Sequence, residues 1–126
     1  MNAIIAVHTV LSNTIALFFL FIGLWGLFRA IRGHTVDGSY LGALVIGQII
    51  YIVQGALGGL LWMTGHIGAV DRPEMHILYG AFAVVFLPFV YFVWLRGDDS
   101  NAAQWVLAFT TLFLWGIALR ATGTAV

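Results

Sequence analysis

Long apolar segments alternate with short polar segments along this chain. Each apolar segment has the length of about 20 residues that crossing a bilayer requires. The apolar segments cover residues 3–28, 39–63, 75–95 and 102–119, and the polar connections cover residues 29–38, 64–74 and 96–101. Connections this short join antiparallel neighbours. The pattern therefore predicts an all-α membrane protein, with residues 1–126 forming one antiparallel bundle of four transmembrane helices.

Composition supports an integral membrane protein and excludes several kinds of site. Hydrophobic residues make up 62% of the chain and charged residues 8%, whereas a soluble domain keeps roughly a quarter of its residues charged. The net charge is zero and basic residues form no run, which argues against a nucleic-acid partner. Cysteine is absent, so disulfides, iron–sulfur clusters and c-type haem attachment are excluded. Residues 1–7 carry no basic residue, so we expect a retained first span rather than a signal peptide.

Polar residues at the helix ends and within the spans predict local structure. Asp71 and Glu74 have the spacing of a capping box at the start of the third helix, and Asn101 with Gln104 offers a similar start for the fourth. Pro88 should kink the third span, and a neighbouring helix should satisfy the carbonyl that the proline leaves without a donor. Two glutamines at membrane depth also need partners, so we expect at least one of them, Gln48 or Gln54, to point inward.

The arginines favour one orientation. Arg29, Arg32 and Arg96 lie in the first and third connections, whereas Arg72 and Arg120 lie at the opposite end. By the positive-inside rule, the first group is cytoplasmic. The chain is therefore expected in a bacterial cytoplasmic membrane with both termini on the extracytoplasmic side.

Two histidines open the first and third spans. In an up-down bundle these helices run in the same direction, so His8 and His76 should lie at one membrane face and meet across the core. Each is followed four residues later by a small residue, Ser12 or Gly80, which leaves space for a flat ring. Neutral histidine is an axial ligand of haem iron, so the pair is interpreted as a haem site. The alternative is that they are interfacial histidines bonded to backbone or water.

Other residues at this face are candidates for the same site. His66 follows the second span and could replace one ligand or bond to a haem propionate, although a solvated loop position also explains it. Arg72 and Arg120 could pair with propionates, or their side chains could extend to lipid headgroups. His34 lies in the opposite connection and is interpreted as a surface residue.

The second span is rich in glycine. Gly55 and Gly59 form a GxxxG pair, which lets another helix approach closely. The same glycines would let a cofactor ring lie against the backbone. Simple helix packing explains the motif equally well.

The order of these motifs resembles a unit of heme A synthase. In that family a histidine opens one helix, a Q-G-x-L-G-G helix follows, and a second histidine opens the next. Here the order is His8, then Gln54-Gly55-Ala56-Leu57-Gly58-Gly59, then His76, and the segment Leu114–Thr124 resembles the family's G-A-x-V-R-x-T-G-S. The resemblance covers most of the chain, with the helices in a rotated order. It implies a haem b site at His8 and His76 in the extracytoplasmic leaflet.

The chain departs from that family where the enzyme does its chemistry. Ile5 stands where the family has a glutamate tied to catalysis, and Thr9 stands where the family has an arginine. The family's cysteine pair is missing, and one bundle is present where the enzyme has two. Synthesis of haem A is therefore not expected.

Two functions remain open from the sequence. The first is a b-type cytochrome subunit that binds one haem b for electron transfer within a larger redox complex, with other membrane subunits, lipid and a quinone as candidate partners. The second is a cofactor-free accessory subunit of a respiratory or photosynthetic complex. Independent catalytic activity is not indicated. The spans carry no acidic residue or lysine at mid-depth, which argues against a transporter.

Overall fold

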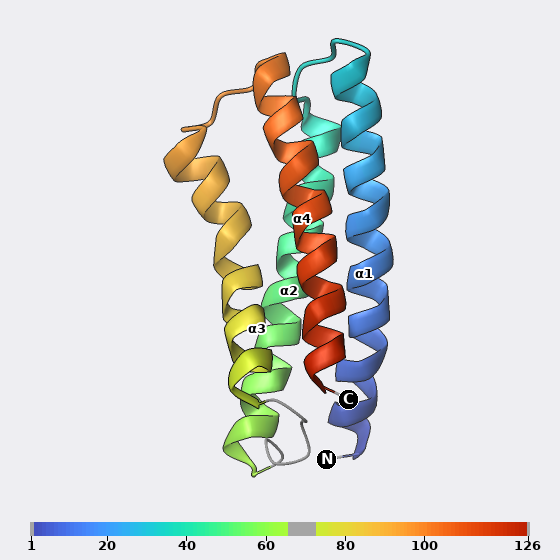
Figure 1. Ribbon diagram of the computed structural model, residues 1–126, viewed down its shortest axis with the longest axis vertical. Coiled ribbons are helices and arrows are strands. Elements are labelled where there is room, and N and C mark those ends of the chain that lie inside the picture. The colour runs from blue at the N-terminus through green and yellow to red at the C-terminus, as the bar shows by residue number, and fades with distance from the viewer. Residues whose placement is uncertain (1, 66–72, 126) are drawn as a thin grey trace.

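The protein is a bundle of four membrane-length helices (Figure 1). The computed structural model describes residues 2–65 and 73–125, and it contains no strand in this part of the chain. The helices are α1 (Asn2–Ile31), α2 (Gly38–Met63), α3 (Pro73–Pro88) with its π-helical continuation η2 (Phe89–Trp94), and α4 (Asn101–Ala125). Neighbouring helices run antiparallel, and both chain ends lie at the same end of the bundle (Figure 1). The predicted all-α four-helix bundle is confirmed.

Helix α1 continues to Ile31, beyond the apolar segment predicted for residues 3–28. Its end is a Schellman motif, in which Gly33 has a φ of 77° and its N–H donates to the carbonyl of Ala30. The N–H of His34 donates to the carbonyl of Arg29 at 2.9 Å. The helix therefore ends at the glycine signal and not where hydrophobicity first falls.

The start of α4 corrects the predicted cap. Ser100, and not Asn101, caps the helix, because its Oγ accepts from the N–H of Ala103 at 3.2 Å. The Nδ2 of Asn101 instead donates to the carbonyls of Ala30 and His34. Gln104 is fully buried and donates to the carbonyl of Gly26, so it does not reach back to the cap. The other predicted capping box depends on Asp71, which lies outside the described residues.

Pro88 ends the regular α-helical part of α3, and η2 continues with π-helical geometry. Proline has no N–H, so the carbonyl four residues earlier, that of Val84, loses its helical donor. The side-chain amide of Gln48 on α2 replaces that donor at 2.6 Å. The predicted rescue of this carbonyl and the inward direction of Gln48 are both confirmed. Figure 1 shows η2 leaning away from the other helices.

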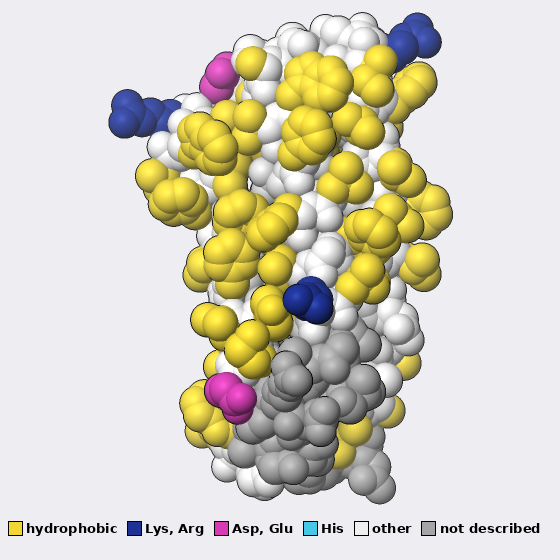
Figure 2. Space-filling view, viewed as in Figure 1, with side chains coloured by type: hydrophobic (Ala, Val, Ile, Leu, Met, Phe, Trp, Pro, Cys, Tyr) yellow, Lys and Arg dark blue, Asp and Glu magenta, His cyan; other side chains and the backbone are white. Residues whose placement is uncertain are grey.

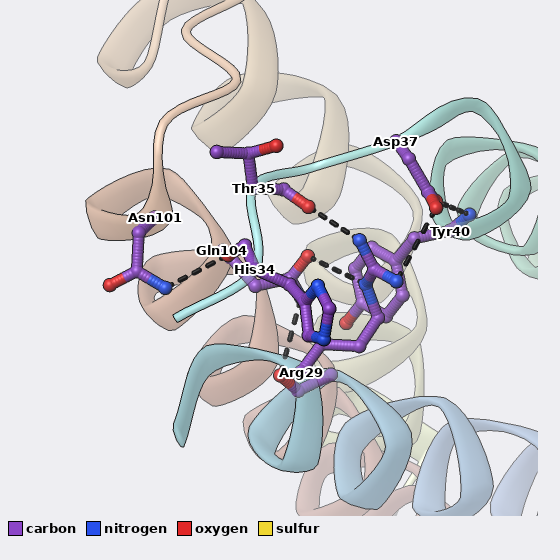
Figure 3. A network of polar contacts seen from close by, with 8 residues as sticks. Arg29, His34, Thr35, Asp37, Tyr40, Asn101 and Gln104 are labelled. Atoms are coloured by element: carbon purple, nitrogen blue, oxygen red, sulfur yellow. Dashed lines mark hydrogen bonds and ion pairs between the residues drawn. The ribbon is translucent and has the colours of Figure 1, made fainter. Parts of the chain in front are cut away.

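A polar network closes the end of the bundle opposite the chain termini (Figure 3). Arg29 forms its centre: its side chain is 14% exposed and lies 3.3 Å from the carboxylate of Asp37. It also donates to Oε1 of Gln104 and to the carbonyl of Thr35. Asp37 in turn caps α2 by accepting from the N–H of Tyr40. These contacts attach the first connection to α1 and α4.

The core is apolar along most of its length, and the outer surface is apolar as well. The largest fully buried side chains include Phe19, Tyr40, Leu107 and Leu114. Figure 2 shows hydrophobic side chains over most of the described part of one face. Many large apolar residues are more than half exposed, among them Phe21 and Phe92. An apolar exterior of this extent is expected for a protein surrounded by lipid.

Candidate functional site

His8 and His76 both begin core-facing stripes. On each helix the stripe continues at intervals of four and three residues, which keeps it on one helical face. The first two residues of each stripe are half-buried and the remaining ones are at most 4% exposed. The α1 stripe contains His8, Ser12, Ile15, Phe19 and Ile22, and the α3 stripe contains His76, Gly80, Ala83, Leu87 and Val90. The two imidazoles therefore extend the hydrophobic core toward the end that holds the chain termini.

The two imidazoles lie close together across the bundle, as predicted, in an edge-on arrangement. Their ring centroids lie 6.3 Å apart and their planes cross at 71°. A metal ion bonded in line to two imidazole nitrogens, each about 2 Å away, places the centroids roughly 6 Å apart. The separation therefore suits one metal ion held between His8 and His76.

His76 is oriented by a main-chain carbonyl. Its Nδ1 lies 2.9 Å from the oxygen of Ala121 on α4. A carbonyl oxygen only accepts, so Nδ1 carries the proton in this contact and the ring lone pair is on Nε2. Metal-bound histidines show this arrangement, in which the second ring nitrogen donates to a carbonyl or carboxylate.

His8 is held by α2. The Nε2 of Gln54 donates to the carbonyl of His8 at 2.8 Å and to Oγ of Ser12 at 3.0 Å. The predicted inward direction of at least one glutamine therefore holds for Gln54 as well as for Gln48. A Cβ added to Gly58 would lie 3.2 Å from Cε1 of His8, so the ring packs against the backbone of α2. Among the described residues, Nδ1 of His8 has no hydrogen-bond partner although it is buried.

The glycines of α2 have distinct surroundings. Gly58 is the one that faces a histidine. A Cβ on Gly55 would lie 3.3 Å from Val84, so Gly55 lies at the contact with α3, whereas a Cβ on Gly59 would meet no atom of the described residues within 4 Å. Gly80, one turn after His76, also has open space at its Cβ position. Small residues therefore lie directly against and beside the histidine pair.

The remaining predicted site residues have different outcomes. His66 and Arg72 lie outside the described residues. Arg120 is exposed and lines a groove between α3 and α4 together with Tyr79 and Trp115. His34 is exposed at the opposite end, as predicted.

The described residues of this site do not form the donor set of a metal held by protein ligands alone. Within residues 2–65 and 73–125, no group of three or more histidine, cysteine or acidic side chains could hold a metal ion. Two imidazoles are the donor set of a haem, in which the porphyrin supplies the other ligands. The buried and unpaired Nδ1 of His8 and the glycine against its ring agree with a ligand of that kind.

Sequence reasoning missed three contributors to this geometry. Gly58 was detectable, because it continues the core stripe of α2 after Tyr51 and Gln54. The link from Gln54 to His8 was not specific in the sequence, which indicated only that the amide needed a partner. The carbonyl of Ala121 carries no side-chain signal at all, since any residue there would present the same oxygen.

Comparison with protein-family models, curated proteins and solved structures finds no match for this chain. The resemblance to heme A synthase therefore stays a prediction from short motifs. Functional inference depends on the geometry of the site.

Proposed function

We propose that this chain is an integral membrane b-type cytochrome subunit in which His8 and His76 are the axial ligands of one haem b. One observation carries the proposal: two half-buried imidazoles from parallel helices lie close together with centroids 6.3 Å apart. When bound, haem b supplies a one-electron iron couple. The chain's own residues determine how that couple is used.

The histidine pair favours electron transfer over chemistry at the iron. His8 and His76 would hold the haem iron between them, and an iron bound by both imidazoles would have no free position for oxygen or a substrate. The Ala121 carbonyl holds His76 in the tautomer whose Nε2 carries the lone pair. Ile15 and Ala83, at most 2% exposed, fill the core one level below the pair and exclude water from that side.

The positions of the arginines support an orientation for the site. Arg29, Arg32 and Arg96 lie at the end of the bundle opposite the histidine pair. By the positive-inside rule we place that end in the cytoplasm and the histidine pair in the extracytoplasmic leaflet of a bacterial membrane.

The shape of the chain supports a function within a larger redox complex. The helices take up almost the whole described chain, and their connections are short. Large apolar side chains on α2 and η2 are exposed, including Ile49, Ile52, Phe92 and Trp94. A protein that exchanges electrons with this subunit would therefore dock largely within the bilayer.

The test is haem content and ligation in the protein purified in detergent. A pyridine haemochrome assay measures haem per chain, and reduced-minus-oxidised spectra report the ligation. We expect one haem b per chain with a six-coordinate low-spin spectrum. His8→Ala and His76→Ala should lose that spectrum, and His34→Ala is the matched control because it removes an exposed histidine from the opposite end. Far-UV circular dichroism checks that each variant remains helical.

Two outcomes would overturn the proposal. A folded wild-type protein that takes up no haem, even when haem is added, would leave the accessory-subunit function as the better account. A His76→Ala variant with an unchanged low-spin spectrum would show that His76 is not a ligand.

A further inference from the structure

Two unpaired polar atoms lie on residues that already contact each other. Among the described residues, Nδ1 of His8 and Oε1 of Gln54 are both buried and without a hydrogen-bond partner. One is a ring nitrogen that can carry a proton, and the other is an amide oxygen that accepts one. The Nε2 of the same Gln54 amide donates to the main-chain carbonyl of His8 at 2.8 Å, so the Gln54 side chain already contacts this residue.

A histidine that binds iron through Nε2 carries its proton on Nδ1, and that proton needs an acceptor. Nearly every metal-bound histidine donates this N–H to a carboxylate, a carbonyl or water. His76 has such an acceptor in the carbonyl of Ala121. Nδ1 of His8 has no hydrogen-bond partner among the described residues.

We propose that Gln54 is the positioning residue for His8 and that its Oε1 accepts the Nδ1–H of His8, directly or through one water, when haem is bound. This inference rests on the proposed haem function and adds to it. Gln54 already contacts the main chain of His8 through its Nε2, so the unpaired Oε1 belongs to an amide that lies against the same turn of α1 as the unpaired Nδ1. Both polar atoms of the Gln54 amide, Oε1 and Nε2, would then contact the same turn of α1, between His8 and Ser12.

The two histidines would then differ in the kind of group that accepts their Nδ1–H. The acceptor for His76 is a main-chain oxygen, which no substitution at residue 121 removes. The acceptor for His8 is a side chain, and its strength sets how strongly the imidazole donates to iron. Residue 54 is therefore the position from which the reduction potential of this site is adjusted.

The experiment compares Gln54→Leu with Gln48→Leu in the haem-loaded protein. Both substitutions remove an inward amide from α2, but Gln48 contacts the carbonyl of Val84 and neither histidine. We expect Gln54→Leu to keep the two-histidine spectrum, to release haem about 10- to 100-fold more readily, and to shift the midpoint potential upward. Gln48→Leu should leave haem affinity and potential at wild-type values. Gln54→Glu retains an acceptor oxygen and should keep the potential at or below the wild-type value.

The outcomes separate this inference from the proposed function. If wild-type protein binds haem through both histidines but Gln54→Leu matches Gln48→Leu in affinity and potential, the role of Gln54 is refuted and the cytochrome function stands. If the folded wild-type protein binds no haem, both are refuted. A loss of thermal stability shared by the two variants reflects helix packing alone, and only the change in potential and affinity supports the positioning role.

Discussion

The hydrogen bond between Gln48 and Val84 makes a quantitative prediction about how α2 and α3 associate. Pro88 removes the helical donor to the Val84 carbonyl, and Nε2 of Gln48 supplies a replacement at 2.6 Å. Gln48→Leu should therefore leave a carbonyl without its donor inside the membrane. Hydrogen bonds between membrane helices contribute about 0.6 kcal/mol on average and up to about 1.7 kcal/mol. A buried carbonyl that loses its partner costs about 1–3 kcal/mol.

We therefore expect Gln48→Leu to destabilise the protein by about 1–2 kcal/mol. The substitution also removes Oε1 of Gln48, a buried atom with no hydrogen-bond partner among the described residues, which offsets part of this cost. A double-mutant cycle with Pro88→Ala cancels that offset, because it is common to both backgrounds. Alanine at position 88 restores the N–H that bonds to the Val84 carbonyl, so Gln48→Leu should cost less there. The expected coupling free energy is about 1 kcal/mol.

The assay is unfolding in mixed detergent micelles with increasing sodium dodecyl sulfate, followed by far-UV circular dichroism for all four proteins of the cycle. Equal costs of Gln48→Leu in the wild-type and Pro88→Ala backgrounds would refute the reasoning. That result would mean that the amide does not replace the proline's missing donor.

Two further predictions concern the histidine end of the bundle. Gly58→Ala places a Cβ 3.2 Å from Cε1 of His8, so haem affinity should fall by about 10-fold while the stability of the haem-free protein is kept or raised by the better helix propensity of alanine. Gly59→Ala, whose Cβ meets no atom within 4 Å in the described part of the chain, is the control in a haem titration, and equal affinities for the two variants would contradict the packing of His8 on Gly58. Alkaline phosphatase fused to the C-terminus should be active and green fluorescent protein fused there should be dark, because both termini are placed outside the cytoplasm; the opposite pattern would reverse the orientation.

The proximity of His8 and His76 could be predicted from the sequence because it depends only on helical periodicity and on the order of the helices. The spacing from His8 to Ile15 and from His76 to Ala83 is the same, so each histidine lies on the core face of its helix. Helices one and three run in the same direction, which places the two histidines at one level. No longer-range information was required.

The errors lie where neighbouring polar groups compete for the same function. Ser100 and Asn101 both suit a cap, and the structure uses Ser100 because Asn101 bonds across to the end of α1. Arg29 belongs to the predicted first connection, yet it lies in α1 and is held inside the network with Asp37. These outcomes depend on contacts between segments distant in the sequence.

The site could be predicted only in part for a related reason. The glycine against the histidine ring is Gly58 and not a member of the Gly55–Gly59 pair, because Gly58 lies on the same face of α2 as Tyr51, whose hydroxyl donates to the carbonyl of Leu114. The contact between the Ala121 oxygen and His76 depends on how α4 lies alongside the start of α3. Every residue has a main-chain oxygen, so the residue type at position 121 does not indicate that this oxygen contacts His76.

Electron paramagnetic resonance of the oxidised, haem-loaded protein tests the central claim most directly, since the spectrum reports both the number and the mutual angle of the axial imidazoles. Two imidazoles crossing at an angle near 71° should give a highly anisotropic low-spin ferric signal that disappears in His8→Ala and in His76→Ala. A high-spin signal from the wild-type protein, or a low-spin signal that survives either substitution, would contradict ligation by this pair.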